Sequence, residues 1–423
     1  MSNFIYREKG FRKKLANGIM MKYIRCDDRG KMHNRINICY TSAGSSIGKN
    51  CVAHLLEHCV LKKPDGTEID VDFRNHLFFN AYTTYSATSY YLTTTDRFQK
   101  DNFHIQEDLL HNVTVLVNNL VYGEITQKTF DTERDIVRNE ISTNVYASEF
   151  ASVHAMELLY DIKLHGRDLK EFMDDITLED VLEYREKRYV SENMVVCIVG
   201  NCTQNTLDAI ESLLEKIPAT KGCTKIFGRK IGVKPEYKIP FPEYVVNNEE
   251  LNYGIALFEN TKEMKCTKEF LTKAHFLKSV IDDFRYDIMR NIRDMGFYRL
   301  DTFIHDDALN FSNYNNSISF QLYDQNLDTV KQGMDYISGI KEALKEILSD
   351  EEVFIQSRNS FENDRIYYHD DILYSDGGIT DSKDTNFTDF GYVDEIVRNL
   401  TREEIIEFID SLVLTVKVVF PFK

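Results

Sequence analysis

The sequence lacks several features that would place the protein in common functional classes. No window approaches the roughly 18 unbroken apolar residues that a membrane-spanning helix needs. No apolar segment follows the basic N-terminal residues, so the sequence predicts no signal peptide, and we expect a cytoplasmic protein. No basic tract with interleaved aromatic residues occurs, and the net charge of -17 disfavours nucleic acid as a partner.

Cysteines are present, but they lack the spacing of a metal-binding or disulfide framework. None of the eight cysteines belongs to a CxxC pair. In a long chain with no export signal, we interpret them as free thiols that are mostly buried. The remaining composition, 43% hydrophobic and 28% charged residues, is typical of a folded protein. A length of 423 residues is too great for one ordinary core and predicts two domains.

The two halves of the chain share a sequence pattern. Residues 177–184 (TLEDVLEY) and 401–408 (TREEIIEF) share one pattern: threonine, a variable residue, two acidic residues, two aliphatic residues, glutamate and an aromatic residue. The threonine is a natural helix N-cap, and an apolar β segment follows each helix, at 194–200 and 414–420. Two common helix starts could coincide by chance, but we favour the duplication of an α+β unit.

Proline marks the expected boundary between the halves. Four of the six prolines lie between residues 218 and 246, which predicts a linker that runs over the surface. We therefore expect domains at 1–217 and 247–423, joined by the linker 218–246. The predicted fold class is α+β, with two homologous domains, each a mostly antiparallel sheet with helices packed on one face.

One short segment, VAHLLEHCVL at residues 52–61, places three polar side chains in an apolar run that is predicted to be helical. His54 and His58 are four residues apart, so they lie one turn apart on one helix face, close enough to share a cation. Imidazole nitrogens suit zinc, and a catalytic zinc needs a third protein ligand, commonly a carboxylate. Glu57 is then left to take a proton from a metal-bound water. The alternative is that all three are incidental polar residues of the core.

These residues resemble a known family. His-x-x-Glu-His is the inverzincin motif, and the segment resembles the pitrilysin/insulinase (M16) family of zinc metallopeptidases, which includes the mitochondrial processing peptidases. Further segments resemble this family in the same order: LANGI at 15–19, TSAGSS at 41–46, NAYT at 80–83 and ERDIVRNE at 133–140. The resemblance covers nearly all of the first half of the chain and is weaker in the second half.

The resemblance implies one zinc ion per chain, with His54, His58 and Glu140 as its ligands and Glu57 as the general base. Glu133 lies two helical turns before Glu140 on a predicted helix, so the two carboxylates face the same way. We expect Glu133 to assist catalysis by orienting a ligand or the water. The alternative for Glu133 is a surface acid on an amphipathic helix.

Two other segments bear on substrate binding. Asn80, Ala81, Tyr82 and Thr83 begin an uncharged stretch at 80–94 that is predicted to be extended. The resemblance implies that a peptide pairs with this strand, and the alternative is an interior strand with no such role. Arg293 and Tyr298 resemble a pair that reaches the substrate from the inactive domain, although their spacing is shorter than in that pattern.

The gap between the second histidine and the third expected ligand also departs from the family pattern. It is a few residues longer, and we place the excess in a charged segment at 62–75 that is predicted to be a loop. The predicted helix beyond it runs over 126–150 and carries both glutamates of that region.

The predicted function is a zinc-dependent endopeptidase that cleaves unfolded peptides, either to remove leader peptides during maturation or to degrade peptides. The first domain would be catalytic, and the second would be an inactive homologous domain that contributes to a substrate chamber. Because the family builds this chamber from four such domains, the resemblance implies a homodimer or a heterodimer with a paralogous subunit. The alternatives are a non-hydrolytic or partner-dependent peptide-binding subunit and a metallochaperone or structural zinc site.

Overall fold

The computed structural model describes most of the chain, in two compact units. The described residues are 10–25, 33–44, 49, 51–70, 78–84, 87–95, 102–141, 145–160, 170–222, 237–238, 241, 245–247, 249–260, 268–284, 288, 300–305, 317–367 and 396–422. The first unit comprises Met1–Ser142, Arg167–Lys225 and His369–Gly391, and the second comprises Thr143–Gly166, Ile226–Tyr368 and Tyr392–Lys423. Within the described residues, no helix is both long and apolar enough to cross a membrane. The domain limits at 217 and 247 stay a prediction.

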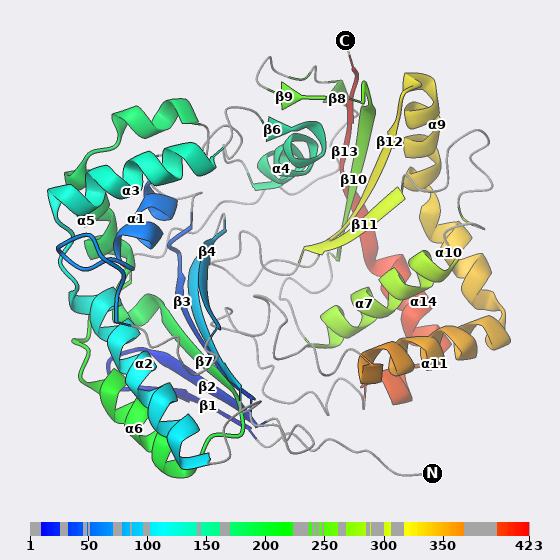
Figure 1. The fold of residues 1–423 in the computed structure, drawn as a ribbon. Helices are drawn as coiled ribbons and strands as arrows, with labels where there is room; N and C mark the ends of the chain where they lie inside the picture. The colour runs from blue at the N-terminus through cyan, green and yellow to red at the C-terminus, as the bar shows by residue number, and fades with distance from the viewer. Residues whose placement is uncertain are drawn as a thin grey trace. The chain divides into compact units, whose positions relative to one another are not determined.

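A six-stranded sheet in the order β1-β2-β7-β3-β5-β4 forms the frame of the first unit (Figure 1). The strands are β1 (Gly10–Lys14), β2 (Met20–Arg25), β3 (His33–Thr41), β4 (Phe78–Thr83), β5 (Ala87–Thr95) and β7 (Met194–Gly200). The pair β2 and β7 is parallel, and the other neighbouring pairs are antiparallel. In this order, β4 is an edge strand of the sheet.

The second unit repeats this topology in a five-stranded sheet, in the order β11-β12-β10-β13-β8. Its strands are β8 (Tyr237–Lys238), β10 (Asn252–Asn260), β11 (Leu300–His305), β12 (Ser317–Asp324) and β13 (Leu412–Phe420), while the short β6 (Val145–Tyr146) and β9 (Val245–Val246) pair separately. β13 pairs in parallel with β8 and antiparallel with β10, just as β7 pairs with β2 and β3. The predicted architecture of two homologous, mostly antiparallel α+β domains is confirmed.

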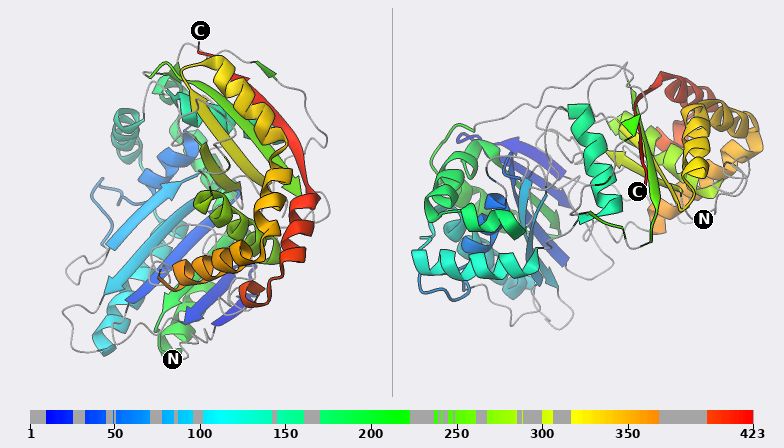
Figure 2. Two further views of the ribbon diagram at one scale, coloured as in Figure 1. Left: turned by 90° about the vertical axis from the view of Figure 1, so that its right-hand side faces the viewer. Right: turned by 90° about the horizontal axis from the view of Figure 1, so that it is seen from above.

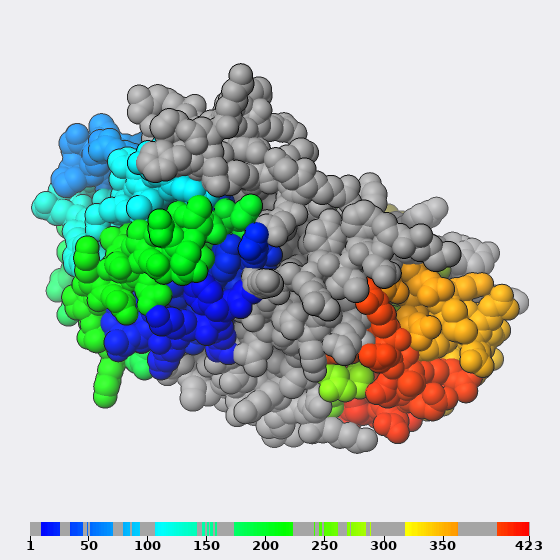
Figure 3. Space-filling view, turned by 90° about the horizontal axis from the view of Figure 1, so that it is seen from below, coloured from blue at the N-terminus to red at the C-terminus, as the bar shows by residue number. Residues whose placement is uncertain are grey.

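Helices cover one face of the first sheet (Figure 1). They are α1 (Val52–Cys59), α2 (Asn102–Tyr122), α3 (Gln127–Glu140), α5 (Leu178–Arg188) and α6 (Gln204–Glu215), with short 3-10 helices at Lys170–Asp175 and Ser191–Asn193. Alternate residues of β3, Ile36 and Ile38, are fully buried on the sheet. Lys13 of β1 forms an ion pair with Glu211 of α6, and Figure 3 shows the surfaces of these blue and green segments side by side.

In the second unit, helices cover both faces of the sheet (Figure 2), whereas the sequence-based expectation was helices on one face. They are α4 (Ala147–Tyr160), α7 (Lys268–Asp283), α9 (Leu327–Ser338), α10 (Ile340–Ser349), α11 (Glu351–Tyr367) and α14 (Arg402–Ser411). On one face, Phe420 contacts Phe150 of α4, with ring centroids 5.8 Å apart. On the other, a Cβ at Gly254 would lie 2.5 Å from Cγ of Met334 of α9, so only glycine allows this approach. Every residue of β10 is therefore buried.

The repeated sequence pattern forms the same helix start in both units. Thr177 accepts a hydrogen bond from the backbone N–H of Asp180 at 3.2 Å, and Asp180 accepts one from the Thr177 N–H at 2.9 Å. Thr401 and Glu404 form the matching pair at 3.2 and 2.8 Å. Each of these two pairs is a capping box: it satisfies two backbone N–H donors at the start of the helix. Each helix leads into an internal strand of its sheet.

Removing either threonine is expected to destabilise the protein. Thr401→Ala leaves the N-terminal backbone donors of α14 without their side-chain acceptor, so the free energy of unfolding should fall by about 1 kcal/mol. Thr401→Asp, which keeps an acceptor at the cap, should stay close to wild type. Urea unfolding followed by circular dichroism measures both, and an alanine variant as stable as wild type would show that the cap contributes nothing.

The structure differs from the sequence-based expectations at two elements that matter for the site. The helix expected over 126–150 ends at Glu140, where Ile141 turns to an extended conformation, and a new helix begins at Ala147. Between them, Val145 and Tyr146 pair with β9. The stretch expected to be extended at 80–94 is a hairpin of β4 and β5, closed by a hydrogen bond of 2.8 Å from the Thr84 N–H to the Ala87 carbonyl.

Candidate metal centre

Helix α1 presents two histidines from one face. Leu55 and Leu56 are fully buried, so the apolar residues of the segment hold the helix in the core. His54 and His58 are partly exposed, and their rings meet edge to face with centroids 5.0 Å apart. The helical spacing and the packing of its neighbours therefore fix the relative position of the two imidazoles.

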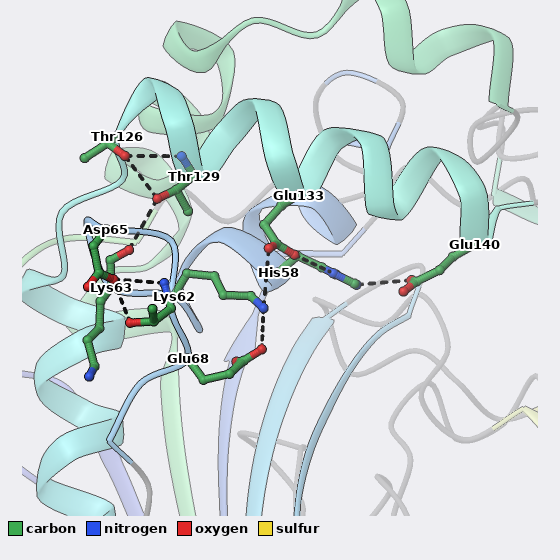
Figure 4. Close-up of polar contacts among 10 residues, drawn as sticks. His58, Lys62, Lys63, Asp65, Glu68, Thr126, Thr129, Glu133 and Glu140 are labelled. Atoms are coloured by element: carbon green, nitrogen blue, oxygen red, sulfur yellow. Dashed lines mark hydrogen bonds and ion pairs between the residues drawn. The ribbon is translucent and has the colours of Figure 1, made fainter.

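Helix α3 brings a carboxylate to the same place. Thr126 caps its start by accepting from the Thr129 N–H at 3.2 Å, and Phe130 and Val137 bury one side of the helix. Glu140 is the last residue of α3. Its Oε2 lies 3.3 Å from Nε2 of His58 and 3.9 Å from Nε2 of His54 (Figure 4 shows the first contact).

The three side chains suit a divalent metal ion. One ligand atom from each of His54, His58 and Glu140 lies within 4.8 Å of the other two, and they form the one such group of His, Cys, Asp or Glu found among the described residues. Ligand atoms at about 2.0 Å from a tetrahedral zinc ion are themselves about 3.3 Å apart. Two imidazoles and one carboxylate are also a donor set that zinc accepts while a fourth position stays open.

Glu133 is not one of the three candidate ligands and instead contacts the other ring nitrogen of His58. Its Oε2 is 3.3 Å from Nδ1 of His58, and the residue is 2% exposed (Figure 4). A carboxylate in this position accepts the Nδ1–H, so the Nε2 lone pair of His58 faces Glu140. Glu133 and Glu140 thus contact the two nitrogens of one ring from the same face of α3.

Glu57 of α1 is buried next to His58 in the sequence and is hydrogen-bonded to strand β4. The Thr83 hydroxyl donates a hydrogen bond of 2.6 Å to Oε2 of Glu57. Thr83 in turn contacts the hydroxyl of Thr88 at 3.1 Å, and Thr88 donates to the Ala43 carbonyl at 2.8 Å. Burial raises the pKa of Glu57, and the hydrogen bond from Thr83 opposes this shift.

The two histidines have different electrostatic surroundings. Burial and the neighbouring His58 lower the pKa of His54 to about 4, so its imidazole is neutral near pH 7. Burial also lowers the pKa of His58, but the hydrogen bond to Glu133 and the charges of Glu140 and Glu57 outweigh it, and the net shift is upward. A metal ion at Nε2 of His58 would therefore compete with a proton.

Cys59 adjoins the centre but differs from its ligands in chemistry. Burial raises the pKa of the Cys59 thiol to about 12. A thiol binds zinc as the thiolate, so this side chain is suited to packing rather than to ligation.

The four predicted substrate-binding residues of the first half lie on β4. Ala81 and Thr83 face the helices, whereas Asn80 and Tyr82 alternate to the other face. The Ala81 N–H donates at 2.8 Å to the side chain of Asn80, not to a neighbouring strand. Among the described strands β4 has one neighbour, β5, so its second edge is not paired. Arg293 and Tyr298 lie outside the described residues.

Sequence reasoning did not identify two contacts of the centre. It assigned Thr83 to the substrate, whereas the hydroxyl contacts Glu57. It treated Lys62 as part of a charged loop, whereas Nζ of Lys62 lies 3.4 Å from Oε1 of Glu133. Lys62 lies beyond the end of α1 at Cys59, so helical spacing from His58 does not predict this contact.

Comparisons with known proteins agree with this fold. The family described as the peptidase M16 inactive domain matches residues 175–260, a range that contains none of the residues of the centre. The "Probable mitochondrial-processing peptidase subunit beta" of Schizosaccharomyces pombe is 27% identical over 177 residues, which are 39% of this chain and 36% of that protein. The "Uncharacterized zinc protease YmfH" of Bacillus subtilis is 22% identical over 269 residues, 62% of this chain and 53% of that protein.

A solved structure extends the match to the whole chain. A protease from Helicobacter pylori superposes with a TM-score of 0.70 and 14% sequence identity, covering 98% of this chain and 99% of that one. By contrast, the chain spans about half the length, or less, of the curated relatives that it matches. The family model and the named relatives support a relationship of this chain to the M16 peptidases, and the solved structure shows that the fold is shared along the whole chain.

Proposed function

We propose that the protein is a zinc-dependent endopeptidase that cleaves unfolded peptides. The observation that carries this proposal is the arrangement of four side chains. His54, His58 and Glu140 present three ligand atoms within 4.8 Å of one another, and Glu57 stands beside them, buried and bonded to Thr83. A structural zinc site has four protein ligands, so three ligands with an adjacent buried carboxylate favour catalysis.

The residues divide the chemistry among them. A zinc ion held by His54, His58 and Glu140 would polarise the scissile carbonyl and lower the pKa of a water molecule. Glu57 takes the proton from this water at a carboxylate oxygen and passes it to the leaving amine. Burial raises the pKa of Glu57 toward neutral pH. A group whose pKa lies closer to the working pH can both accept a proton and release it again.

The unpaired edge of β4 suits an extended peptide. A peptide that adds as a further strand is held by its own backbone, and this gives affinity without a requirement for particular side chains. Asn80 bonds the Ala81 N–H through its own side chain, so an incoming peptide carbonyl would replace the Asn80 oxygen on that donor. Asn80, Ala81 and Tyr82 would then contact the substrate, with Thr83 turned toward Glu57.

Partner and cellular location belong to the same proposal. The name of the S. pombe relative describes it as a subunit, which supports assembly with a second copy or a paralogous chain. A cytoplasmic location stays a prediction. The alternative function is a peptide-binding subunit that hydrolyses nothing without its partner, and Glu140 and Glu57 at the centre favour the active form, since a purely binding subunit has no use for them.

Metal analysis and peptide cleavage together test the proposal. We expect about one zinc per purified chain and hydrolysis of a quenched-fluorescence peptide library, alone or after addition of a candidate partner. A chelator should stop the hydrolysis, and added Zn²⁺ should restore it. Bound zinc without cleavage under any of these conditions would contradict the enzymatic part, and absence of zinc affinity would contradict the metal site.

Substitution of Thr83 separates orientation of the base from substrate binding. Thr83→Val keeps the shape of the side chain but removes the hydroxyl that bonds Glu57, so kcat should fall roughly tenfold while KM stays near wild type. Thr83→Ser, which keeps the hydroxyl, should recover most of the activity. A rise in KM with kcat unchanged would instead assign Thr83 to the substrate.

A further inference from the structure

The loop that follows α1 is hydrogen-bonded to the residues at the start of α3. We call residues 61–70 the tether loop. It closes on itself through hydrogen bonds from the Lys63 N–H to the Thr67 carbonyl at 2.7 Å and from the Ile69 N–H to the Leu61 carbonyl at 3.2 Å. Three side chains of the α3 region donate to its carbonyls: Thr126 to Pro64 at 3.1 Å, Lys128 to Asp65 at 2.7 Å and Thr129 to Lys63 at 3.4 Å.

This loop directs Lys62 toward the metal centre. Nζ of Lys62 lies 3.4 Å from Oε1 of Glu133 and also forms an ion pair with Glu68 (Figure 4). The side chain of Lys62 is 16% exposed, whereas that of Glu68 is 69% exposed. The ion pair with Glu68 is therefore a surface contact, and the contact with Glu133 is an internal one.

The carboxylate of Glu133 divides its two oxygens between two partners. Oε1 faces Lys62, and Oε2 faces Nδ1 of His58 at 3.3 Å. At 2% exposure, Glu133 has little access to water, so the two partners must supply the interactions that hydration would give. If either partner is removed, part of the negative charge of Glu133 has no compensating interaction, and the carboxylate can rotate away from the remaining partner.

We propose that Lys62 is a positioning residue of the metal site. Its ammonium group holds Glu133 so that Oε2 stays on Nδ1 of His58, and this fixes the Nε2 lone pair of His58 toward the metal. The inference rests on the proposed zinc site and adds a residue to it. Such outer contacts commonly change metal affinity by about 10–100-fold when they are lost.

The charge of Lys62 supports this role. Burial lowers its pKa, but the hydrogen bond to Glu68 and the charge of Glu133 outweigh burial, and the net shift is upward. Lys62 therefore carries its positive charge at neutral pH. The tether loop, bonded to α3 at three places, keeps this charge opposite Glu133 instead of letting it extend into the solvent.

The neighbouring lysine offers a matched control. Lys63 lies in the same loop and pairs with Asp70 at 2.5 Å, but both side chains are more exposed, at 35% and 78%. Exposed pairs of this kind contribute little. Lys63→Met removes the same charge from the same loop without touching Glu133.

Zinc affinity provides the test, measured by competition between the apo-protein and a chromophoric chelator for Zn²⁺. We expect Lys62→Met to bind Zn²⁺ about tenfold more weakly than wild type. Lys62→Arg, which keeps a cation, should recover most of the affinity, and Lys63→Met should equal wild type. Equal affinity in wild type and Lys62→Met, with the wild type binding Zn²⁺, would overturn this inference alone.

A double-mutant cycle distinguishes positioning from a general effect on the loop. Glu133→Gln should itself weaken Zn²⁺ binding, and Lys62→Met added to it should cause no further loss, because Lys62 acts through the carboxylate. A full tenfold loss on the Glu133→Gln background would overturn the positioning role and assign the effect to loop structure. A wild-type chain with no affinity for Zn²⁺ would overturn the proposed function and this inference with it.

Discussion

Replacing Glu57 by glutamine should abolish peptide cleavage and leave the metal bound. The amide has nearly the same shape and still offers an oxygen to the Thr83 hydroxyl, so the local packing should persist. It cannot accept the proton of the attacking water. General base catalysis commonly contributes 10²–10⁴-fold, and we expect kcat to fall by about a thousandfold.

The measurement combines metal content and cleavage rate in the same preparation. Zinc by atomic emission should stay near one per chain in Glu57→Gln, since Glu57 is outside the group of candidate ligands. Glu215→Gln, at an exposed glutamate of α6, is the control and should match wild type in both measurements. Cleavage that survives in Glu57→Gln would show that another group takes the proton.

Elements with strong local signals could be predicted closely from the sequence. The capping pattern at Thr177 and the apolar run after it predicted a helix start at this threonine and a strand at 194–200, and the structure has a helix at Leu178–Arg188 and a strand at Met194–Gly200. The same logic gave α14 and most of β13. Caps and apolar runs act within a few residues, so the sequence around them is sufficient.

Elements that depend on distant partners were predicted less well. The composition of 126–150 is helical throughout, yet Val145 and Tyr146 leave the helix to pair with β9, about a hundred residues later in the chain. Strand β1, whose sequence is GFRKK, has little apolar signal and takes its form by pairing with β2. Tertiary contacts decide such segments, and local propensity does not contain them.

The site shows the same division between local and distant information. The positions of His54 and His58 follow from helical spacing alone, and the structure places their rings 5.0 Å apart. Nothing in the spacing of Glu140 indicates that it meets them, and only the family resemblance suggested it. The contacts of Thr83 with Glu57 and of Lys62 with Glu133 join separate elements, so they required the three-dimensional structure.

Glu140→Gln should remove zinc binding more severely than any substitution behind the ligands. The residue contributes the single carboxylate of the group and lies 3.3 and 3.9 Å from the two imidazoles. Two histidines alone form an incomplete zinc site, and the neutral amide is a weaker donor than a carboxylate. We expect Zn²⁺ affinity to fall by more than about a hundredfold, and cleavage to be lost at zinc concentrations that saturate the wild type.

The decisive comparison is with Asp135, an exposed acid on the same helix. Asp135→Asn removes the same charge from α3, so it should lower Zn²⁺ affinity little if ligation, and not general electrostatic attraction, is the cause. Excess Zn²⁺ should restore part of the activity of Glu140→Gln but none of that of Glu57→Gln, because the first lacks metal and the second lacks the base. A Glu140→Gln variant with wild-type affinity would mean that the third ligand comes from another residue.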